Sequence, residues 1–421
     1  MQWTRSISSP LSRLPLQLAV VLLLLFSANP LWADFKSAKG MFLRGAAVGD
    51  VETMLDALES LLPFDTKENA ELLVSQGLIQ EDILVHREVL KILAELKDAE
   101  ARKVVADACA DHKRWEVRAS AAQVCSRYGE YAFAKLSEAG KDRQWQVRAQ
   151  AYRALAGHRK RASIDFLIKR MKNEAPRVLW DLTWALEQLT GMSLGDQYTS
   201  WLAWWQPNSE TFQVPTRKEA EEKLPEKAEK KDVGTAVREG LYGPIFSERV
   251  AFLFDVSGSM SVGVEEKGSR IQIAKDELVR VLQDQLSPSS YFNVITFSED
   301  VKVYSKGLQK ASKSKVRRAV KFVEALQAGG ETNAFGALKM AFEDKNVDTI
   351  FLLSDGQPTV GEETIPAIIH QTVAGWNRSR KIVINCIGFF PGSAKNQDKK
   401  QAREFLKKLS LENDGVYLEI Y

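Results

Sequence analysis

Three oxygen-bearing side chains alternate in the stretch DVSGSM and could together bind a cation. Asp255, Ser257 and Ser259 follow the apolar run of residues 250–254, which has the character of a short strand buried on both faces of a parallel sheet. A set of oxygen donors suits a hard cation such as Mg²⁺, because zinc prefers nitrogen and sulfur. Taken alone, the triplet is equally compatible with a capped turn, since Asp and Ser side chains bind nearby backbone N–H groups.

Two later segments carry further oxygen donors, one in a glycine-rich loop and one at the end of an apolar run. Thr332 follows the glycine pair Gly329 and Gly330, and Asp355 follows a second apolar run at residues 350–353. In a doubly wound sheet, the loops at the carboxyl ends of the strands form the ligand crevice. We therefore expect Thr332 and Asp355 to lie beside the DVSGSM turn.

DVSGSM, Thr332 and Asp355 together resemble the metal-ion-dependent adhesion site of von Willebrand factor type A (VWA) domains, a resemblance that covers roughly residues 249–421. It implies that the hydroxyls of Ser257, Ser259 and Thr332 contact a divalent ion, Mg²⁺ or another such as Mn²⁺ or Ca²⁺. It also implies that Asp255 and Asp355 act through water or take a direct bond as the site changes state. The sixth position would be left for a carboxylate of a partner protein, and an ion held mainly by neutral hydroxyls still attracts an anion.

The sequence favours a binding protein over an enzyme. An aspartyl-phosphate enzyme would need a second acid where Ser257 stands. The sequence contains neither a G-x-x-x-x-G-K-S/T loop nor a G-x-G-x-x-G loop, and its histidines fall on helical patterns or their ends: His86, His112, His158 and His370. Two alternatives remain open: a metal-assisted hydrolase that uses the same ion, and a purely structural envelope scaffold.

Strand and helix patterns alternate through residues 241–421, and this predicts a doubly wound, Rossmann-like α/β domain with a mostly parallel sheet. Beyond the two apolar runs, we expect strands at residues 291–297, 301–304 and 416–420, and another around Cys386. Helical patterns separate these strands. The ends of two apolar strands and one Gly-rich loop would then carry the five donors.

Residues 34–206 are predicted to form one helical domain, in which the apolar spacing is helical from about Phe35 to Leu189 and contains an internal repeat. DHKRWEVRASAAQV begins at Asp111 and DRQWQVRAQAYRAL begins at Asp142, so Trp115 and Trp145 occupy the same repeat position. The core W-x-V-R-x-x-A resembles bacterial HEAT-like repeats. That resemblance implies an all-α solenoid of about four or five helix pairs.

Arginines and tryptophans recur in this helical part. We expect Arg118 and Arg148 to pack their stems along a neighbouring helix and to pair with a local acid such as Asp111 or Asp142. The alternative is a binding role. The tryptophans near the end of the repeats predict a cap over the last helix pair, or else a recognition surface for a second partner: Trp180, Trp184, Trp201, Trp204 and Trp205.

Residues 207–240 read as a charged, solvated linker. The segment TRKEAEEKLPEKAEKK has too few apolar residues to form a core, and it is dense in charges of both signs. It would tether two loosely coupled domains. Residues 234–247 should then join the VWA domain, because LYGPIF carries apolar side chains that a free linker would not need.

Residues 1–33 resemble a secretory signal peptide. Arg5 and Arg13 precede an apolar run at residues 14–26, and Ala33 is a small residue at a possible cleavage point. The sequence thus predicts export to the periplasm, the cell envelope or the medium, with an uncleaved anchor as the alternative. The formal net charge of +3 over 421 residues gives no indication of nucleic-acid binding.

The three cysteines are predicted to be buried and unpaired. Cys109 and Cys125 lie on successive helical patterns, offset by about 10 Å at 1.5 Å per residue. A disulfide tolerates a Cα separation of only about 7 Å. Cys386 lies inside an apolar strand pattern, where a thiol acts as a small hydrophobic side chain.

Overall fold

The computed structural model of the chain describes residues 34–224, 230–231, 240–243, 245, 247–264, 268–390 and 397–420. The described chain divides into two compact units, with the boundary between Phe64 and Asp65. The predicted signal segment, residues 1–33, lies outside the described residues. In the part of the chain that is described, no helix combines the length and the apolar character that a membrane crossing requires.

The first unit contains a pair of helices, α2 (Phe35–Val48) and α3 (Val51–Leu61). Asp34 and Asp50 cap the two helices by accepting hydrogen bonds from backbone N–H groups. Gly49 ends α2 with φ at 73°, a left-handed conformation that favours glycine. The pair buries Phe42 and Leu58 on its apolar side.

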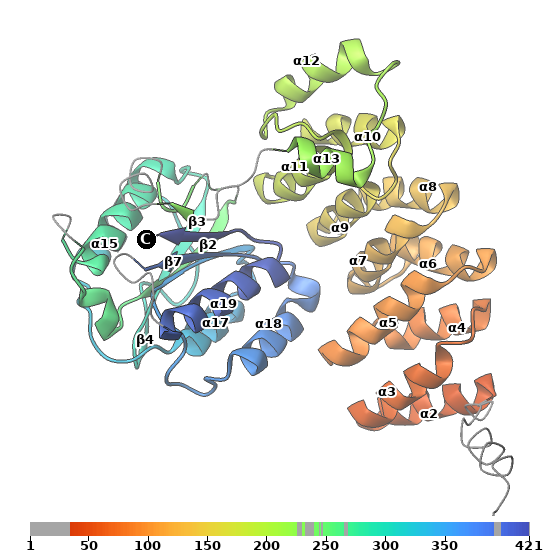
Figure 1. Cartoon of the computed structure of the whole chain (residues 1–421), viewed down its shortest axis with the longest axis horizontal. Coiled ribbons are helices and arrows are strands. Elements are labelled where there is room, and N and C mark those ends of the chain that lie inside the picture. Colours follow the sequence, from red (N-terminus) through yellow and green to blue (C-terminus); the bar gives the residue numbers. More distant parts are fainter. Residues whose placement is uncertain are drawn as a thin grey trace, which may run out of the picture. The chain divides into compact units, whose positions relative to one another are not determined.

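Helices make up the first part of the second unit (Figure 1). They are α4 (Lys67–Leu72), the π turn η1 (Leu73–Gly77), α5 (Ile83–Glu95), α6 (Ala99–Asp111), α7 (Trp115–Val124), the 3-10 turn η2 (Cys125–Arg127), α8 (Glu130–Ala139), α9 (Trp145–Leu155), α10 (Arg161–Met171), α11 (Pro176–Thr190) and α12 (Tyr198–Asn208). The two repeated segments fold alike, because α7 and α9 begin at the equivalent residues Trp115 and Trp145. Helix α7 packs beside α9, and α9 packs beside α11.

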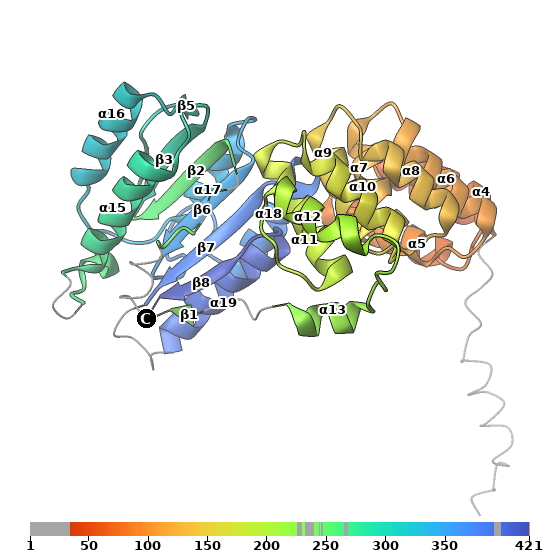
Figure 2. The same ribbon diagram turned by 90° about the horizontal axis from the view of Figure 1, so that it is seen from above.

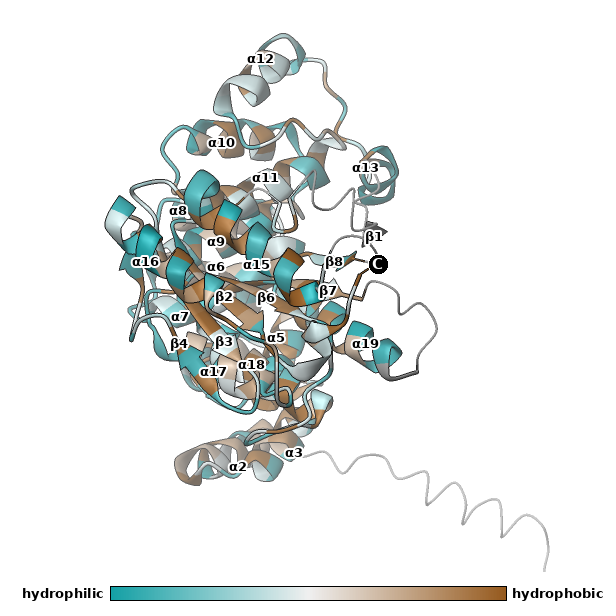
Figure 3. Ribbon diagram, turned by 90° about the vertical axis from the view of Figure 1, so that its left-hand side faces the viewer, coloured by the Kyte–Doolittle hydropathy of each residue, from teal (hydrophilic) through white to brown (hydrophobic). Residues whose placement is uncertain are grey.

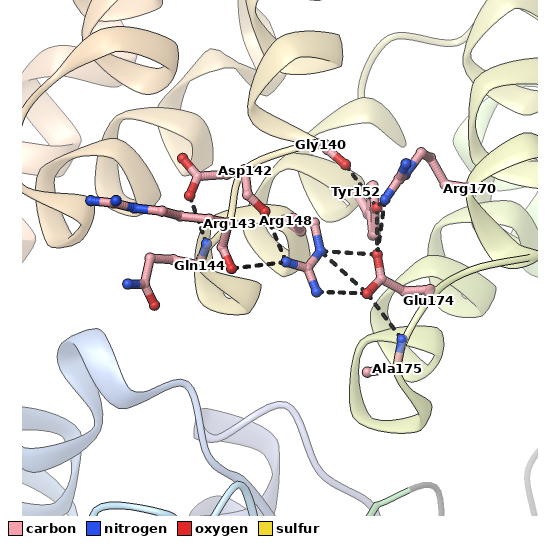
Figure 4. A network of polar contacts seen from close by, with 9 residues as sticks. All are labelled: Gly140, Asp142, Arg143, Gln144, Arg148, Tyr152, Arg170, Glu174 and Ala175. Atoms are coloured by element: carbon pink, nitrogen blue, oxygen red, sulfur yellow. Dashed lines mark hydrogen bonds and ion pairs between the residues drawn. The ribbon is translucent and has the colours of Figure 1, made fainter.

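The repeat arginines form a ladder of ion pairs between successive repeats. Arg118 Nε lies 2.6 Å from Asp142 Oδ2, and its other guanidinium nitrogens donate to Asp142 Oδ1 and the His112 carbonyl. Arg148 repeats this pattern with Glu174 at 2.7 Å and the Asp142 carbonyl at 2.8 Å (Figure 4). Each arginine thus pairs with the acid of the next repeat, which supports the structural interpretation of these residues. Asp111, which the sequence suggested as a partner, pairs with Lys135 instead.

The tryptophans after the last repeat pack mainly among themselves. Trp201 and Trp205 are buried, and Trp204 lies edge-on to both Trp201 and Phe212. This arrangement supports a cap over α10, against which α12 packs. Trp180 and Trp184 on α11 are only half-buried.

The predicted linker is not solvated along its whole length. Residues Arg217–Lys223 form helix α13, which begins with a reciprocal capping box between Thr216 and Glu219. Ala220 is fully buried against α11, next to Gly191. Further along, β1 (Lys230–Lys231) pairs with β8. The Lys223 stem also lies against Gly191, and the Pro215 carbonyl accepts a hydrogen bond from Arg159, contacts that a charged composition does not reveal.

The remaining chain forms an eight-stranded sheet in the order β1-β8-β7-β6-β2-β3-β4, with β5 also pairing with β3. The strands are β2 (Arg249–Asp255), β3 (Tyr291–Phe297), β4 (Val301–Val303), β5 (Gln309–Lys310), β6 (Thr349–Ser354), β7 (Val383–Phe389) and β8 (Tyr417–Ile420). All pairings are parallel except those of β4 and β5 with β3. The prediction of an all-helical N-terminal region followed by a doubly wound α/β domain is confirmed.

Helices cover both faces of the sheet (Figure 2). One face carries α15 (Arg270–Arg280), the π turn η4 (Val281–Gln285) and α16 (Lys313–Glu324); the other carries α17 (Ala334–Glu343), α18 (Pro366–Arg380) and α19 (Gln397–Glu412). Alternate residues of β2 enter opposite cores, with Phe252 and Phe254 on the α15 side and Leu253 on the α17 side. In Figure 3 the central strands are coloured mainly as hydrophobic, whereas the helices around them mix hydrophilic and hydrophobic residues. Leu241 and Tyr242 join the α15-side core, as the LYGPIF pattern predicts.

Hydrogen bonds within the second unit also join helical repeats to turns of the sheet domain. Arg177 donates to the Lys381 carbonyl at 2.7 Å, and Arg153 pairs with Asp414 at 2.8 Å. The Trp180 indole donates to the Asp414 carbonyl. Lys381 and Asp414 both have positive φ, at 54° and 58°, a left-handed backbone conformation that is uncommon for residues other than glycine. Coupling between the two parts is therefore closer than a free tether would give.

The three thiols are free and buried, as predicted. Cys109 and Cys125 nevertheless interact through their side chains. A hydrogen bond with Cys109, together with burial, raises the pKa of Cys125, so the two side chains are in contact. The 3-10 turn η2 at Cys125 ends α7 early and places this residue beside α6, which a count along ideal helices did not anticipate.

Candidate metal site

The carboxyl end of β2 positions the first predicted ligand, Asp255. Its side chain is fully buried, and its two oxygens accept hydrogen bonds from Ser257 N at 2.7 Å and Ser354 Oγ at 2.5 Å. Ser354 is the last residue of β6, so this carboxylate bridges the ends of two adjacent strands. Burial, and then the charge of Asp355, raise the pKa of Asp255 to about 6.

The serine hydroxyls continue the network from β2 to Asp355. Ser257 Oγ lies 3.1 Å from Ser259 Oγ, and Ser259 Oγ donates to Asp355 Oδ1 at 2.5 Å. Ser259 lies on the 3-10 turn η3 (Gly258–Ser261), which returns the chain toward β6. Asp355 is fully buried. An unbroken row of oxygen atoms therefore connects the DVSGSM turn to the end of β6.

Backbone hydrogen bonds bring the Thr332 loop to the same edge. Gly258 N donates to the Gly330 carbonyl at 2.9 Å, and Gly329 N donates to the Val256 carbonyl at 2.8 Å. The Thr332 hydroxyl lies beside Gly356, where an added Cβ would be 3.5 Å from Thr332 Oγ1. The structure thus places all five predicted residues around the carboxyl ends of β2 and β6. These strands are neighbours at the point where strand order reverses.

Two cations that the sequence analysis did not identify also contact Asp355. Arg270, at the start of α15, lies 2.5 Å from Asp355 Oδ2 and is 2% exposed. Lys399 on α19 has its ammonium 3.6 Å from the same oxygen and also donates to the Asp355 backbone carbonyl. Burial lowers the pKa of Lys399, while Asp355 opposes this shift. Two aspartates predicted to be buried side by side require a positive charge nearby, and the sequence could have indicated that much. It does not indicate which Lys or Arg supplies the charge.

The donor set fits a hard divalent cation. Two carboxylates and three hydroxyls offer oxygen atoms only, and each of these residues except Ser259 is at most 5% exposed. Among the described residues, no group of three or more His, Cys, Asp or Glu side chains gathers in a metal-binding arrangement, and this argues against a zinc-type site in that part of the chain.

Comparisons with known proteins agree with this assignment of the fold. A family model described as von Willebrand factor type A domain matches residues 250–357. "Inter alpha-trypsin inhibitor, heavy chain 4" of Mus musculus is 35% identical over 190 residues, which cover 42% of this chain and 18% of that protein. "Von Willebrand factor A domain-containing protein 3B" of Homo sapiens is 28% identical over 179 residues, which cover 42% of this chain and 12% of that protein. The chain therefore spans less than a fifth of these relatives.

Among solved structures, the von Willebrand factor type A protein from Catenulispora acidiphila aligns with a TM-score of 0.34 and 21% identity, over 42% of this chain and 39% of that one. The matched segment of the family model begins within β2 and ends just after Asp355, so it includes all five predicted ligands. Residues 250–357 therefore form a von Willebrand factor type A domain.

Proposed function

We propose that this chain is a metal-dependent protein-binding protein, in which Asp255, Ser257, Ser259, Thr332 and Asp355 hold Mg²⁺ or a similar divalent ion. The ion would capture an acidic side chain of a partner protein. The observation that carries the proposal is the convergence of two buried carboxylates and three hydroxyls at one edge of the sheet. Because hydroxyls neutralise little of the ion's charge, an anionic partner is the expected ligand.

The rival from another class is a metal-assisted hydrolase. Such an enzyme needs a base or nucleophile beside the ion. The side-chain contacts described around the five donors involve Ser354, Thr359, Arg270 and Lys399, and none of these four belongs to a base–nucleophile pair. The binding function therefore has more support. Turnover of an ester or phosphate panel that disappears with Asp355→Ala would favour the hydrolase.

Isothermal titration of Mg²⁺ into the full chain tests the metal site. The unsubstituted chain should bind Mg²⁺, Asp255→Ala should abolish the heat of binding, and Ser259→Ala should weaken binding by about tenfold or more. Asp276→Ala on α15 is the matched control, since Asp276 is exposed and contacts Gln272 instead of the site. Equal heats from Asp255→Ala and the unsubstituted chain would contradict the proposal.

We also propose that the helical region is an exported HEAT-like scaffold that presents the VWA domain. The repeating helix pairs and their ladder of ion pairs support the scaffold. Export rests on the composition of residues 1–33. Recovery of a partner from envelope extract with and without a chelator separates the hypotheses, because a purely structural scaffold would retain its partner after the metal is removed.

A second partner on the helical repeats would use a pocket of about 220 Å³ on α11 and the loop that follows it. Its lining combines the rings of Trp180 and Trp184 with Thr183 and the acids Glu187 and Asp196. Indole rings beside carboxylates attract a cation, so the pocket suits a Lys or Arg side chain. Titration with N-acetyl-arginine amide should change the indole fluorescence in a saturable way, and Asp196→Asn should weaken this binding several-fold. An unchanged emission would remove this role from the pocket.

A further inference from the structure

Among the described residues, two cations of the chain itself contact the carboxylate of the predicted metal ligand Asp355. Its Oδ2 faces the Arg270 guanidinium at 2.5 Å and the Lys399 ammonium at 3.6 Å, and its Oδ1 accepts from Ser259. Arg270 lies on α15, Lys399 on α19 and Ser259 on the DVSGSM turn, so three separate segments contact this one carboxylate. Each of the two cations is anchored by a helix that packs on the sheet.

The formal charges of these buried groups balance one another. Asp255 and Asp355 contribute two negative charges, and Arg270 and Lys399 contribute two positive charges. The Arg270 side chain is 3% exposed and that of Lys399 is 15% exposed, so solvent screens these charges only weakly. The described side chains of this cluster would therefore offer a divalent ion little net negative charge. The ion's own charge would then be left almost uncompensated until an anion arrives.

We propose that Arg270 and Lys399 are specificity-determining residues that make Mg²⁺ binding conditional on an acidic ligand. They lower the affinity of the site for Mg²⁺ alone, and they raise its demand for a carboxylate once Mg²⁺ is bound. Mg²⁺ and the acidic partner therefore strengthen each other's binding, and by linkage this coupling is reciprocal. The inference rests on the proposed function, since it concerns the regulation of that same site.

Titration of the full chain with Mg²⁺, in the presence and absence of acetate as a carboxylate probe, tests this coupling. Acetate should tighten Mg²⁺ binding by the unsubstituted chain several-fold. Lys399→Gln and Arg270→Gln should each bind Mg²⁺ alone about tenfold more tightly, because one buried repelling charge is removed. Their binding should also depend less on acetate. Arg270→Lys keeps the charge and should restore the acetate dependence.

Lys400→Gln is the matched control for Lys399→Gln. Lys400 is the next residue on α19, its side chain is 66% exposed, and it pairs with Glu404 away from the site. This control removes the same charge from the same helix and should leave Mg²⁺ affinity unchanged. The thermal midpoint without metal shows whether each variant is folded. If Arg270→Gln unfolds, Lys399→Gln carries the test, since its side chain is the more exposed of the two.

The outcomes separate this inference from the proposed function. If the unsubstituted chain, Lys399→Gln and Arg270→Gln bind Mg²⁺ with equal affinity and equal acetate dependence, while Asp355→Ala does not bind, the metal site stands and the inference is wrong. If none of the variants binds Mg²⁺ with or without acetate, the proposed function itself is wrong and the inference falls with it. Tighter binding by Lys399→Gln but not by Lys400→Gln would establish the inference.

Discussion

Replacing Glu174 with alanine should lower the free energy of unfolding of the helical repeats by about 3–5 kcal/mol. The Glu174 side chain is 1% exposed and accepts from two nitrogens of Arg148, from the Tyr152 hydroxyl at 2.7 Å and from Ala175 N at 3.0 Å (Figure 4). Its removal leaves the Arg148 guanidinium without its carboxylate in a site that water reaches poorly. Urea denaturation followed by far-UV circular dichroism measures the loss.

The control for this prediction is Glu130→Ala, which removes the same side chain from an exposed ion pair. Glu130 contacts Lys160 at 2.7 Å, but its side chain is 86% exposed. Solvent-exposed pairs of this kind contribute little, so the denaturation midpoint should not change measurably. A double replacement, Arg148→Met with Glu174→Leu, should recover much of the stability, because neither charge is then left alone. Equal losses from Glu174→Ala and Glu130→Ala would show that burial of the pair is unimportant.

Gly415→Ala should destabilise the sheet domain by about 3 kcal/mol or more, because the neighbouring backbone cannot move to make room for the added methyl group. An added Cβ would lie 2.0 Å from the Ile384 carbonyl oxygen and 2.5 Å from its carbon. Both atoms belong to the backbone of β7, which pairs with β6 and β8 and cannot move away independently. The free energy of unfolding, or failure to obtain soluble protein, reports the effect.

Gly375→Ala on α18 is the matched substitution with the opposite expected sign. A Cβ at Gly375 would meet no atom within 4 Å, and the residue lies inside a helix. Alanine there should stabilise the domain by about 0.5–1 kcal/mol, because it restricts the unfolded chain and favours the helix. A loss of stability at Gly375 similar to that at Gly415 would mean that the clash is not the cause.

The strands that position the site were predictable because each is short, apolar and bounded by polar residues. The strand predicted at residues 291–297 is β3 without any change of bounds, and the runs before Asp255 and Asp355 became neighbouring strands. The rule that the carboxyl ends of parallel strands share one edge then predicts that the donors following these strands lie together. The apolar pattern was sufficient to predict these strands, because a strand buried on both faces consists almost entirely of apolar residues.

Arg270 and Lys399 could not be predicted in the same way. Arg270 is 85 residues from Asp355 and Lys399 is 44 residues from it, so their contacts depend on which helix crosses which end of the sheet. Nothing in their local sequence differs from that of the exposed lysines and arginines around them. The docking of α13 was not predicted for a related reason. One buried alanine does not stand out in a charged segment.

The register of the arginine ladder suggests that the helical array can be shortened by a whole repeat. Excision of residues 113–142 would remove Arg118 together with its acid Asp142. Arg148 would then take the sequence position of Arg118, six residues after His112, and could donate to the His112 carbonyl as Arg118 now does. Glu174 would stay with Arg148, so no buried charge would lose its counter-ion. Loss or gain of a thirty-residue module would therefore leave no buried charge of the ladder unpaired. Because α7 also packs against α18, the contacts with the sheet domain would have to change with the length of the array.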